Sequence, residues 1–98
     1  INESLSDIWG EALDLTNGSA DDTAENRWLV GEGSALGVIR SMKDPTQFDH
    51  PDRYGVYLNL PVFIDNGGVH INSGIGNKLF YLLVDGGLFN TYTVEPMD

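Results

Sequence analysis

A histidine and an aspartate lie five residues apart in the stretch DNGGVHINSG, residues 65–74. The glycine pair between them tolerates positive φ, so a local turn can bring the Asp65 carboxylate to the His70 imidazole. Such a contact orients the ring and raises its pKa, which preserves a proton donor near neutral pH. The spacing therefore indicates either a donor role for His70, with Asp65 as its orienting group, or a loop histidine that is hydrogen-bonded to backbone.

Two acidic residues near the start of the chain share one helical face, because Glu3 and Asp7 occupy positions i and i+4, about 6 Å apart along a helix axis. Like charges at that spacing repel, so the pair favours a cation or a histidine network opposite. Glu3 is then a candidate metal ligand, and Asp7 a candidate acceptor for the N–H of a metal-bound histidine. Two exposed helix acids, stabilised by the helix dipole, are the alternative.

Arg40 follows the apolar stretch ALGVI, residues 35–39, which would hold the stem of its side chain. A fixed guanidinium beside a partly buried site can stabilise a developing oxyanion. An arginine that neutralises one of the many carboxylates is the alternative. His50, between Asp49 and Pro51 in a polar loop, is predicted to be exposed and without a role.

Two helices are predicted to position these groups, one over residues 1–16 and one over residues 72–85 with Asn72 or Ser73 as its N-cap. Apolar side chains at helical spacing in the first helix predict a buried stripe: Ile1, Leu5, Ile8, Trp9, Ala12, Leu13 and Leu15. The aromatic residues expected in the core are Trp9, Trp28, Phe80 and Tyr81.

The long middle of the chain, residues 17–71, is predicted to be largely irregular, with an extended piece over residues 56–64. The tail is expected to form one short strand before Pro96. The predicted fold class is therefore mainly α with long irregular loops. Because a self-contained domain rarely devotes so much chain to loops, a metal or partner chain holds them, or the chain is a piece of a larger protein, which is the interpretation we favour.

Composition excludes several classes of function. The 98 residues contain 5 Lys and Arg against 15 Asp and Glu, a net charge of −10. That balance argues against nucleic acid and against an anionic membrane surface, but it suits bound cations such as calcium. The absence of cysteine excludes disulfides and thiolate zinc sites.

Three stretches together resemble the thermolysin-like zinc metallopeptidases, a gluzincin family: NESLSDIWG, IRSMKDP with DHPDRY, and DNGGVHINSGIGNKLFYLLVDGG. Their order and approximate spacing match as well as their residues. The resemblance covers about residues 1–94, but only the middle of the family's catalytic region. It implies that residues 1–98 are part of the helical C-terminal domain of such a peptidase, without the lobe that carries H-E-x-x-H and without the later C-terminal helices.

The resemblance also implies metal sites. Glu3 matches the family's third zinc ligand, and Asp7 matches the aspartate that supports a zinc-bound histidine. The other two zinc ligands and the glutamate base belong to H-E-x-x-H, which would lie before residue 1. Asp14 and Glu32 match carboxylates of a calcium site, but Arg27 stands near the place of another acidic ligand, so one reduced calcium site at most, or none, is expected.

For the substrate, the resemblance implies that Arg40 contacts the carbonyl and shapes the pocket beside the scissile bond, and that Asn66 contacts the substrate backbone. His70 matches the histidine that stabilises the tetrahedral oxyanion, and Asp65 matches its orienting carboxylate. Zinc and the glutamate base would activate water for attack on a peptide carbonyl. This interpretation requires Glu3 and His70 to converge on one cavity.

The sequence therefore predicts a fragment of a secreted zinc endopeptidase, which acts on peptides or proteins together with the remainder of its catalytic domain. The isolated chain is expected to be inactive, because a single glutamate does not hold catalytic zinc. Two other interpretations stay open. One is a non-catalytic acidic module that folds around calcium or binds proteins. The other is a degenerate family relative that is kept for protein–protein contact.

Overall fold

The computed structural model describes residues 1–17, 23–31 and 34–97. Within these ranges three α-helices carry most of the regular structure: α1 (Asn2–Asn17), α2 (Asp65–Asn72) and α3 (Gly74–Asp85). Short strands and 3-10 helices complete the order: β1 (Leu29–Val30), β2 (Arg40–Ser41), η1 (Pro45–Phe48), η2 (Tyr54–Val56), β3 (Gly87–Phe89) and β4 (Tyr92–Val94). The predicted class, mainly α with long irregular loops, is confirmed.

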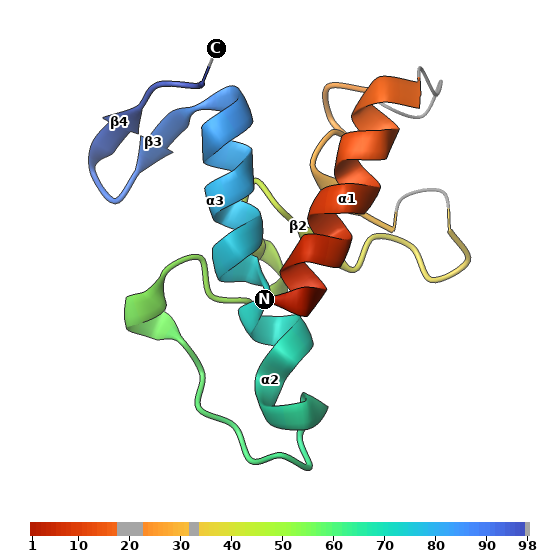
Figure 1. Cartoon of the computed structure of the whole chain (residues 1–98), viewed down its shortest axis with the longest axis vertical. Coiled ribbons are helices and arrows are strands. Elements are labelled where there is room, and N and C mark those ends of the chain that lie inside the picture. Colours follow the sequence, from red (N-terminus) through yellow and green to blue (C-terminus); the bar gives the residue numbers. More distant parts are fainter. Residues whose placement is uncertain (18–22, 32–33, 98) are drawn as a thin grey trace.

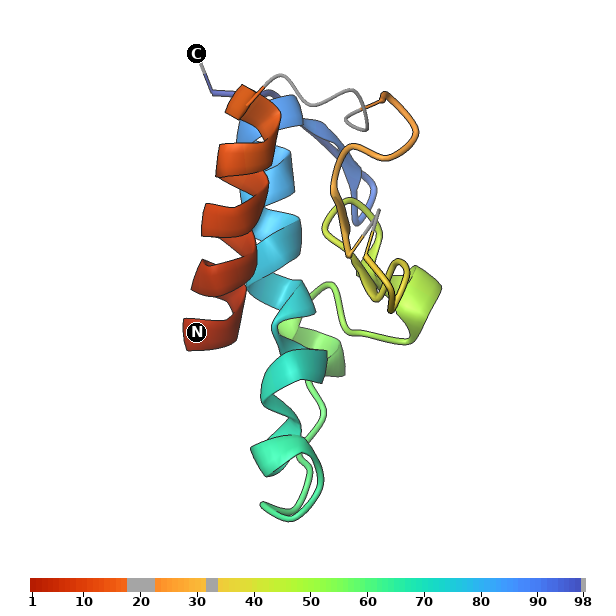
Figure 2. The same cartoon turned by 90° about the vertical axis from the view of Figure 1, so that its right-hand side faces the viewer.

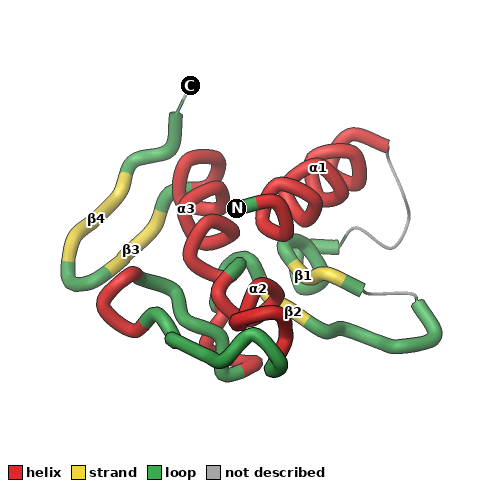
Figure 3. Tube along the Cα trace, turned by 60° about the horizontal axis from the view of Figure 1, so that its bottom comes forward, coloured by secondary structure: helices red, strands yellow, loops and turns green. Residues whose placement is uncertain are grey.

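Helices α1 and α3 pack side by side and run in the same direction, while α2 extends beyond the N-terminal end of α3 (Figures 1 and 2). The β3–β4 hairpin lies on the side of α3 away from α1 (Figure 3). Strand β2 pairs with β1 in the antiparallel register Leu29↔Ser41 and Val30↔Arg40. The fold thereby brings the start of α1, the α2–α3 junction and the arginine of β2 into one region.

The inner face of α1 is polar, since its buried residues are Ser4, Asp7 and Glu11. Four members of the predicted buried stripe are instead exposed, at 98%, 48%, 69% and 64%: Ile1, Leu5, Trp9 and Leu13. At 100° per residue these four form a line, here called the outer stripe, opposite the buried polar residues. The prediction of a buried apolar stripe is therefore wrong for these four residues, because the polar face is the one that packs against the rest of the chain.

The apolar core is small. Apart from glycines and prolines, the buried apolar residues within the described ranges are Trp28, Met42 and Leu82. The Trp28 ring contacts Phe80 and Tyr81 edge-on, with centroids 5.9 and 5.4 Å apart. The core prediction is thus correct for Trp28, whose two aromatic neighbours are half-buried, and wrong for Trp9. So small a core leaves the packing of α1 on α3 dependent on polar contacts.

Residues 56–64 form no β-strand, and the segment is held by a side chain. The amide of Asn72 accepts the N–H of Leu58 at 2.9 Å and donates to the Leu58 carbonyl at 2.8 Å. Of the two predicted N-cap residues, Ser73 occupies the N-cap position of α3, but its hydroxyl donates to the His70 carbonyl at 2.5 Å and does not cap the helix. The second long helix consequently begins at Gly74, directly after α2.

The tail forms a hairpin rather than the single strand expected. Strands β3 and β4 pair antiparallel in the register Gly87↔Val94, and Asn90 and Thr91 take φ values of 50° and 71° at the turn. Positive φ at both central residues matches the twist of the flanking strands. In the described part of the chain, no helix has the length and apolar character needed to cross a bilayer.

Candidate active site

The contact between Asp65 and His70 is built by a kink at the start of α2. Asn66, Gly67 and Gly68 adopt φ values of 48°, 84° and 87°, a region that glycine enters at little cost. The chain turns back so that Asp65 Oδ1 lies 2.5 Å from Nδ1 of His70, while Asp65 Oδ2 accepts the backbone N–H of His70 at 2.9 Å. The expected local turn is present, and it is formed by residues 65–68, all of which have positive φ within the range assigned to α2.

These contacts bias the protonation of both side chains. The hydrogen bond with Asp65 raises the pKa of His70 above its ordinary value, and the negative charge of Glu3 raises this pKa further. Partial desolvation of the imidazole acts in the opposite direction and lowers the pKa. The same hydrogen bond lowers the pKa of Asp65. Nδ1 of His70 is therefore committed to Asp65, while Nε2 is available to a second partner.

The carboxylate of Glu3 is that second partner. Its Oε2 atom lies 3.2 Å from His70 Nε2, and the two side chains are 40% and 49% exposed. Glu3 also lines an open hollow of about 350 Å³ with Ile1, Asn2 and Val69. The acid of α1 and the imidazole of α2 therefore face each other, and Glu3 remains accessible to a further ligand.

Asp7 and Arg40 form a bidentate ion pair behind this contact. Arg40 Nε donates to Asp7 Oδ2 and Arg40 Nη2 to Asp7 Oδ1, both at 2.8 Å, and the two side chains are largely buried. The predicted repulsion between Glu3 and Asp7 is thus offset, because each carboxylate has its own partner: His70 for Glu3 and Arg40 for Asp7. Asp7 keeps acceptor capacity on Oδ1, so the pairing does not prevent it from accepting one more N–H.

Sequence reasoning missed two residues of this cluster, Ser4 and Asn77. Asn77 is fully buried; its Nδ2 donates to Asp7 Oδ2 at 2.7 Å, and its Oδ1 accepts from Ser4 Oγ at 2.8 Å. The available signal was a lone amide in the apolar run GIGNKLFYLL, together with a serine three residues before Asp7 on the same helical face.

Zinc fits Glu3 as one oxygen donor, because that carboxylate is half exposed and lines a hollow. Catalytic zinc takes three protein ligands. Across residues 1–17, 23–31 and 34–97, no three His, Cys, Asp or Glu side chains are grouped so that they could hold a metal ion. Within the described residues, a zinc ion could thus find one donor in Glu3 but not a complete set of three ligands.

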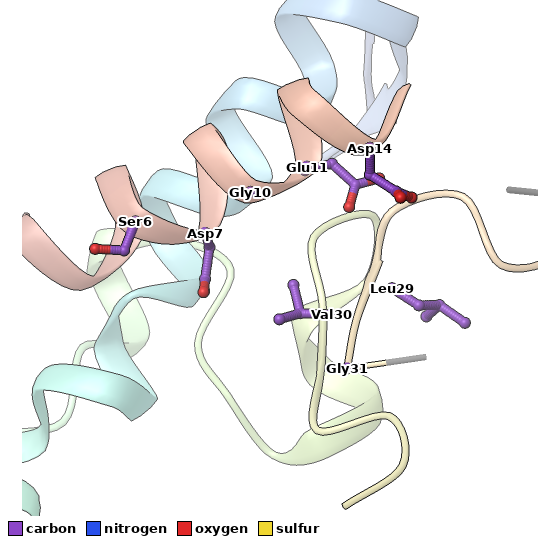
Figure 4. A pocket seen from close by; sticks show the side chains of 8 residues that line it. All are labelled: Ser6, Asp7, Gly10, Glu11, Asp14, Leu29, Val30 and Gly31. Atoms are coloured by element: carbon purple, nitrogen blue, oxygen red, sulfur yellow. The ribbon is translucent and has the colours of Figure 1, made fainter. Parts of the chain in front are cut away.

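The residues expected at a calcium site are only partly described. Asp14 lines a hollow of about 230 Å³ with Asp7 and Glu11, which project from α1 on the side that faces β1 (Figure 4). Glu11 accepts the backbone N–H of Trp28 at 2.7 Å, so this carboxylate already ties α1 to the residue that precedes β1. Glu32 lies outside the described residues.

Two further residues were singled out by sequence. Asn66 is exposed at the kink beside Asp65, where its amide is open to a ligand. His50 is not the exposed side chain that was predicted: it is half-buried, and its Cβ lies beside Gly74 at the start of α3. Its Nδ1 atom is buried and lacks a hydrogen-bond partner in the described structure. Burial accordingly lowers the pKa of His50, and the charge of Arg40 lowers it further.

Comparison of the amino-acid sequence with known proteins identifies a family. The family described as "Thermolysin metallopeptidase, alpha-helical domain" matches residues 1–97. A zinc metalloproteinase of Renibacterium salmoninarum is 56% identical over 100 residues, which cover 96% of this chain and 18% of that protein.

Other relatives are similar over the same region. A bacillolysin of Bacillus cereus is 40% identical over 99 residues, covering 96% of this chain and 16% of that protein. A thermolysin of Alicyclobacillus acidocaldarius subsp. acidocaldarius is 42% identical over 94 residues, covering 90% of this chain and 16% of that protein. The chain thus spans less than a fifth of the length of these curated relatives.

Proposed function

The chain belongs to the thermolysin metallopeptidase family, in its alpha-helical domain, and from this premise we propose that it supplies one zinc ligand and the oxyanion-stabilising side of a zinc endopeptidase. The observation that carries the proposal is the meeting of Glu3 and His70 at 3.2 Å, beside the Asp65 carboxylate that orients the imidazole. Acid and imidazole come from distant segments, and a pair that only stabilised a helix end would not need an oriented ring.

In this proposal Glu3 is the zinc ligand, and two further ligands and a base come from outside the 98 residues. Zinc, when bound, supplies a Lewis acid for the peptide carbonyl and an activated water. His70 then donates through Nε2, the atom that faces Glu3 in this structure, to the oxygen on which charge develops. Asp65 holds the ring by accepting from Nδ1, so the donor keeps its direction.

Arg40 and Asn66 complete the proposed substrate contacts. Arg40 places Nε and Nη2 on Asp7, and neither contact uses Nη1, which keeps its two N–H donors for a substrate carbonyl. Asn66 presents an exposed amide beside the Asp65–His70 pair, where it can pair with the backbone of a peptide. Asp7 fixes Arg40 and would also accept from a zinc-bound histidine.

We further propose that the rest of a catalytic domain covers the outer stripe, so that residues 1–98 are a partial domain. Four large apolar groups in one line are more than a lone helix normally exposes to water. Because curated relatives are more than five times as long as the matched region, the occupant we infer is another part of the same domain. The 98-residue chain alone would then be inactive. Secretion of the whole enzyme rests on the family resemblance.

A reduced calcium site is a separate proposal that rests on Asp14 and its place in the acidic hollow beside β1. Arg27, which stands near the place of an acidic ligand, forms an ion pair with Asp85 at 3.0 Å. This pair ties the loop before β1 to the end of α3. Calorimetric titration of the full-length protein with calcium, with and without Asp14→Asn, tests the site; equal heats in both proteins would exclude Asp14 as a ligand.

The main test is hydrolysis of an internal peptide bond by the full-length protein that contains this chain. We expect activity that disappears when a chelator removes zinc and returns when zinc is restored. We expect none from the purified 98-residue chain. A full-length protein that binds zinc but cleaves no peptide would contradict the proposed function, and activity that survives complete zinc removal would contradict the proposed chemistry.

A further inference from the structure

A buried chain of hydrogen bonds runs from Ser4 on α1 to Asn77 on α3, returns to α1 at Asp7, and ends at the Arg40 guanidinium on β2. Ser4 Oγ donates to Asn77 Oδ1 at 2.8 Å, and Asn77 Nδ2 donates to Asp7 Oδ2 at 2.7 Å. Asp7 in turn accepts twice from Arg40. Ser4, Asp7 and Asn77 are exposed by 7%, 7% and 0%, so water does not compete for these bonds.

The orientation of the Asn77 amide is determined by its two partners. A carboxylate can only accept, so the nitrogen of the amide must face Asp7. The carbonyl oxygen then faces Ser4, whose hydroxyl can donate. Reversing the amide would set its oxygen against the carboxylate, which costs free energy in a buried setting. Ser4 thus fixes the amide of Asn77 in the direction that Asp7 needs.

The close approach of α1 and α3 at Gly76 makes this link feasible. A Cβ at Gly76 would lie 2.3 Å from Ser4 Oγ, so any side chain there would push Ser4 away from α3. Glycine at this position therefore lets the hydroxyl of Ser4 reach the next residue, Asn77. The contact is a built feature of the helix crossing rather than an incidental surface bond.

A buried ion pair is well oriented only when its remaining hydrogen-bonding capacity is also used. Asp7 could otherwise rotate about its terminal torsion, which is broad for a carboxylate. The bond from Asn77 holds Asp7 Oδ2, and with it the plane in which Arg40 Nε and Nη2 must lie. The direction of Arg40 Nη1, the nitrogen proposed to meet the substrate carbonyl, is set by the same plane.

We propose that Asn77, held by Ser4, is a positioning residue that acts through Asp7 to fix the direction of the Arg40 guanidinium toward substrate. This inference rests on the proposed function of Arg40. It predicts that loss of the Asn77 amide matters for catalysis only while the arginine is present. A residue that merely stabilised the fold would lower activity regardless of the side chain at position 40.

The test uses the full-length protein and a double-mutant cycle. Asn77→Leu keeps the branched shape of the side chain and removes both hydrogen bonds. We expect kcat/KM to fall roughly 10-fold, by analogy with the loss of a group that orients a metal ligand. In the Arg40→Lys background, Asn77→Leu should change kcat/KM by less than about 2-fold, the range for uncoupled sites. Equal losses in both backgrounds would overturn the inference.

A second pair of variants distinguishes loss of the network from misfolding. Ser4→Ala leaves Asn77 in place and should show the same dependence on Arg40 with a smaller loss. Its matched control is Ser6→Ala, because the Ser6 hydroxyl is exposed and bonds to the Asn2 carbonyl of its own helix. Ser6→Ala should leave kcat/KM unchanged, and a loss equal to that of Ser4→Ala would count against the network.

A readout without substrate separates this inference from the proposed function. With selectively ¹⁵N-labelled arginine, exchange of the Arg40 Nε–H with water reports how firmly Asp7 holds the guanidinium. We expect this exchange to be faster in Asn77→Leu than in the wild type and unchanged in Ser6→Ala. Unchanged exchange in Asn77→Leu would refute the positioning role even if peptides are cleaved. Faster exchange would support it even if no peptide is cleaved.

Discussion

Asp65 Oδ1 lies 2.5 Å from Nδ1 of His70, so one nitrogen of this imidazole is committed to a carboxylate, while the other faces Glu3. The ring is therefore fixed in orientation before any substrate arrives. A preoriented donor needs little reorganisation when charge develops, which is the condition under which such groups contribute most to catalysis.

Replacing the imidazole should lower the chemical rate and leave the metal in place. We expect His70→Ala to reduce kcat of the full-length enzyme by about 100-fold or more, as for loss of an oxyanion donor. Zinc content, measured by atomic absorption, should stay unchanged because Glu3 is intact. His50→Asn is the control for loss of an imidazole, because the proposal assigns His50 no contact with zinc or substrate. An unchanged kcat in His70→Ala would refute the donor role.

Replacing the proposed zinc ligand should remove the metal, which His70→Ala should leave in place. Glu3→Gln keeps the shape of the side chain but removes its charge, so we expect the full-length enzyme to lose stoichiometric zinc and, with it, activity. Asp14→Asn, another acid of α1, should retain zinc. If Glu3→Gln bound zinc with wild-type stoichiometry after dialysis, Glu3 would not be a ligand.

The parts of this site that are local in sequence were predictable. The spacing of Asp65 and His70 around two glycines predicts their contact, because a short turn alone brings them together. The ion pair of Asp7 with Arg40 and the amide of Asn77 depend on how three separate elements pack. Sequence spacing carries no direct information on such contacts, so neither the ion pair between Asp7 and Arg40 nor the role of Asn77 is predicted from the sequence.

The orientation of α1 shows a second limit of prediction from the sequence. Helical periodicity identifies which residues share a face, and it correctly groups the apolar residues of the outer stripe. It does not say which face packs against the segments present in the chain. Ser4, Asp7 and Glu11 find polar partners on α3, β2 and the Trp28 backbone, so the polar face is the buried one here.

The outer stripe gives a prediction about the whole protein. Trp9 is 69% exposed in this chain, and in the full-length enzyme we expect another part of the domain to cover it. Trp9→Ala should then reduce the free energy of unfolding of the full-length enzyme by about 3–5 kcal/mol, as for a buried aromatic residue. Denaturant titration measures the change. A change within about 0.5 kcal/mol, typical of surface positions, would mean that the stripe stays open to water.

His50 gives a prediction about stability and pH. Burial and the charge of Arg40 lower the pKa of His50 in the folded protein, against about 6.5 for an unfolded histidine. Between these two pKa values the unfolded state binds more protons, so the stability from neutral His50 is present above about pH 6.5 and is lost as pH falls through the folded pKa. His70, whose pKa is raised, has the opposite sign, with stability present below about pH 6.5 and lost as pH rises through its folded pKa.

We therefore expect His50→Asn to lose less stability than the wild type between pH 7.5 and 5.5, measured by denaturant titration at both pH values. Other titrating groups are common to both proteins and cancel in the comparison. Parallel losses in the two proteins would show that protonation of His50 is not coupled to folding.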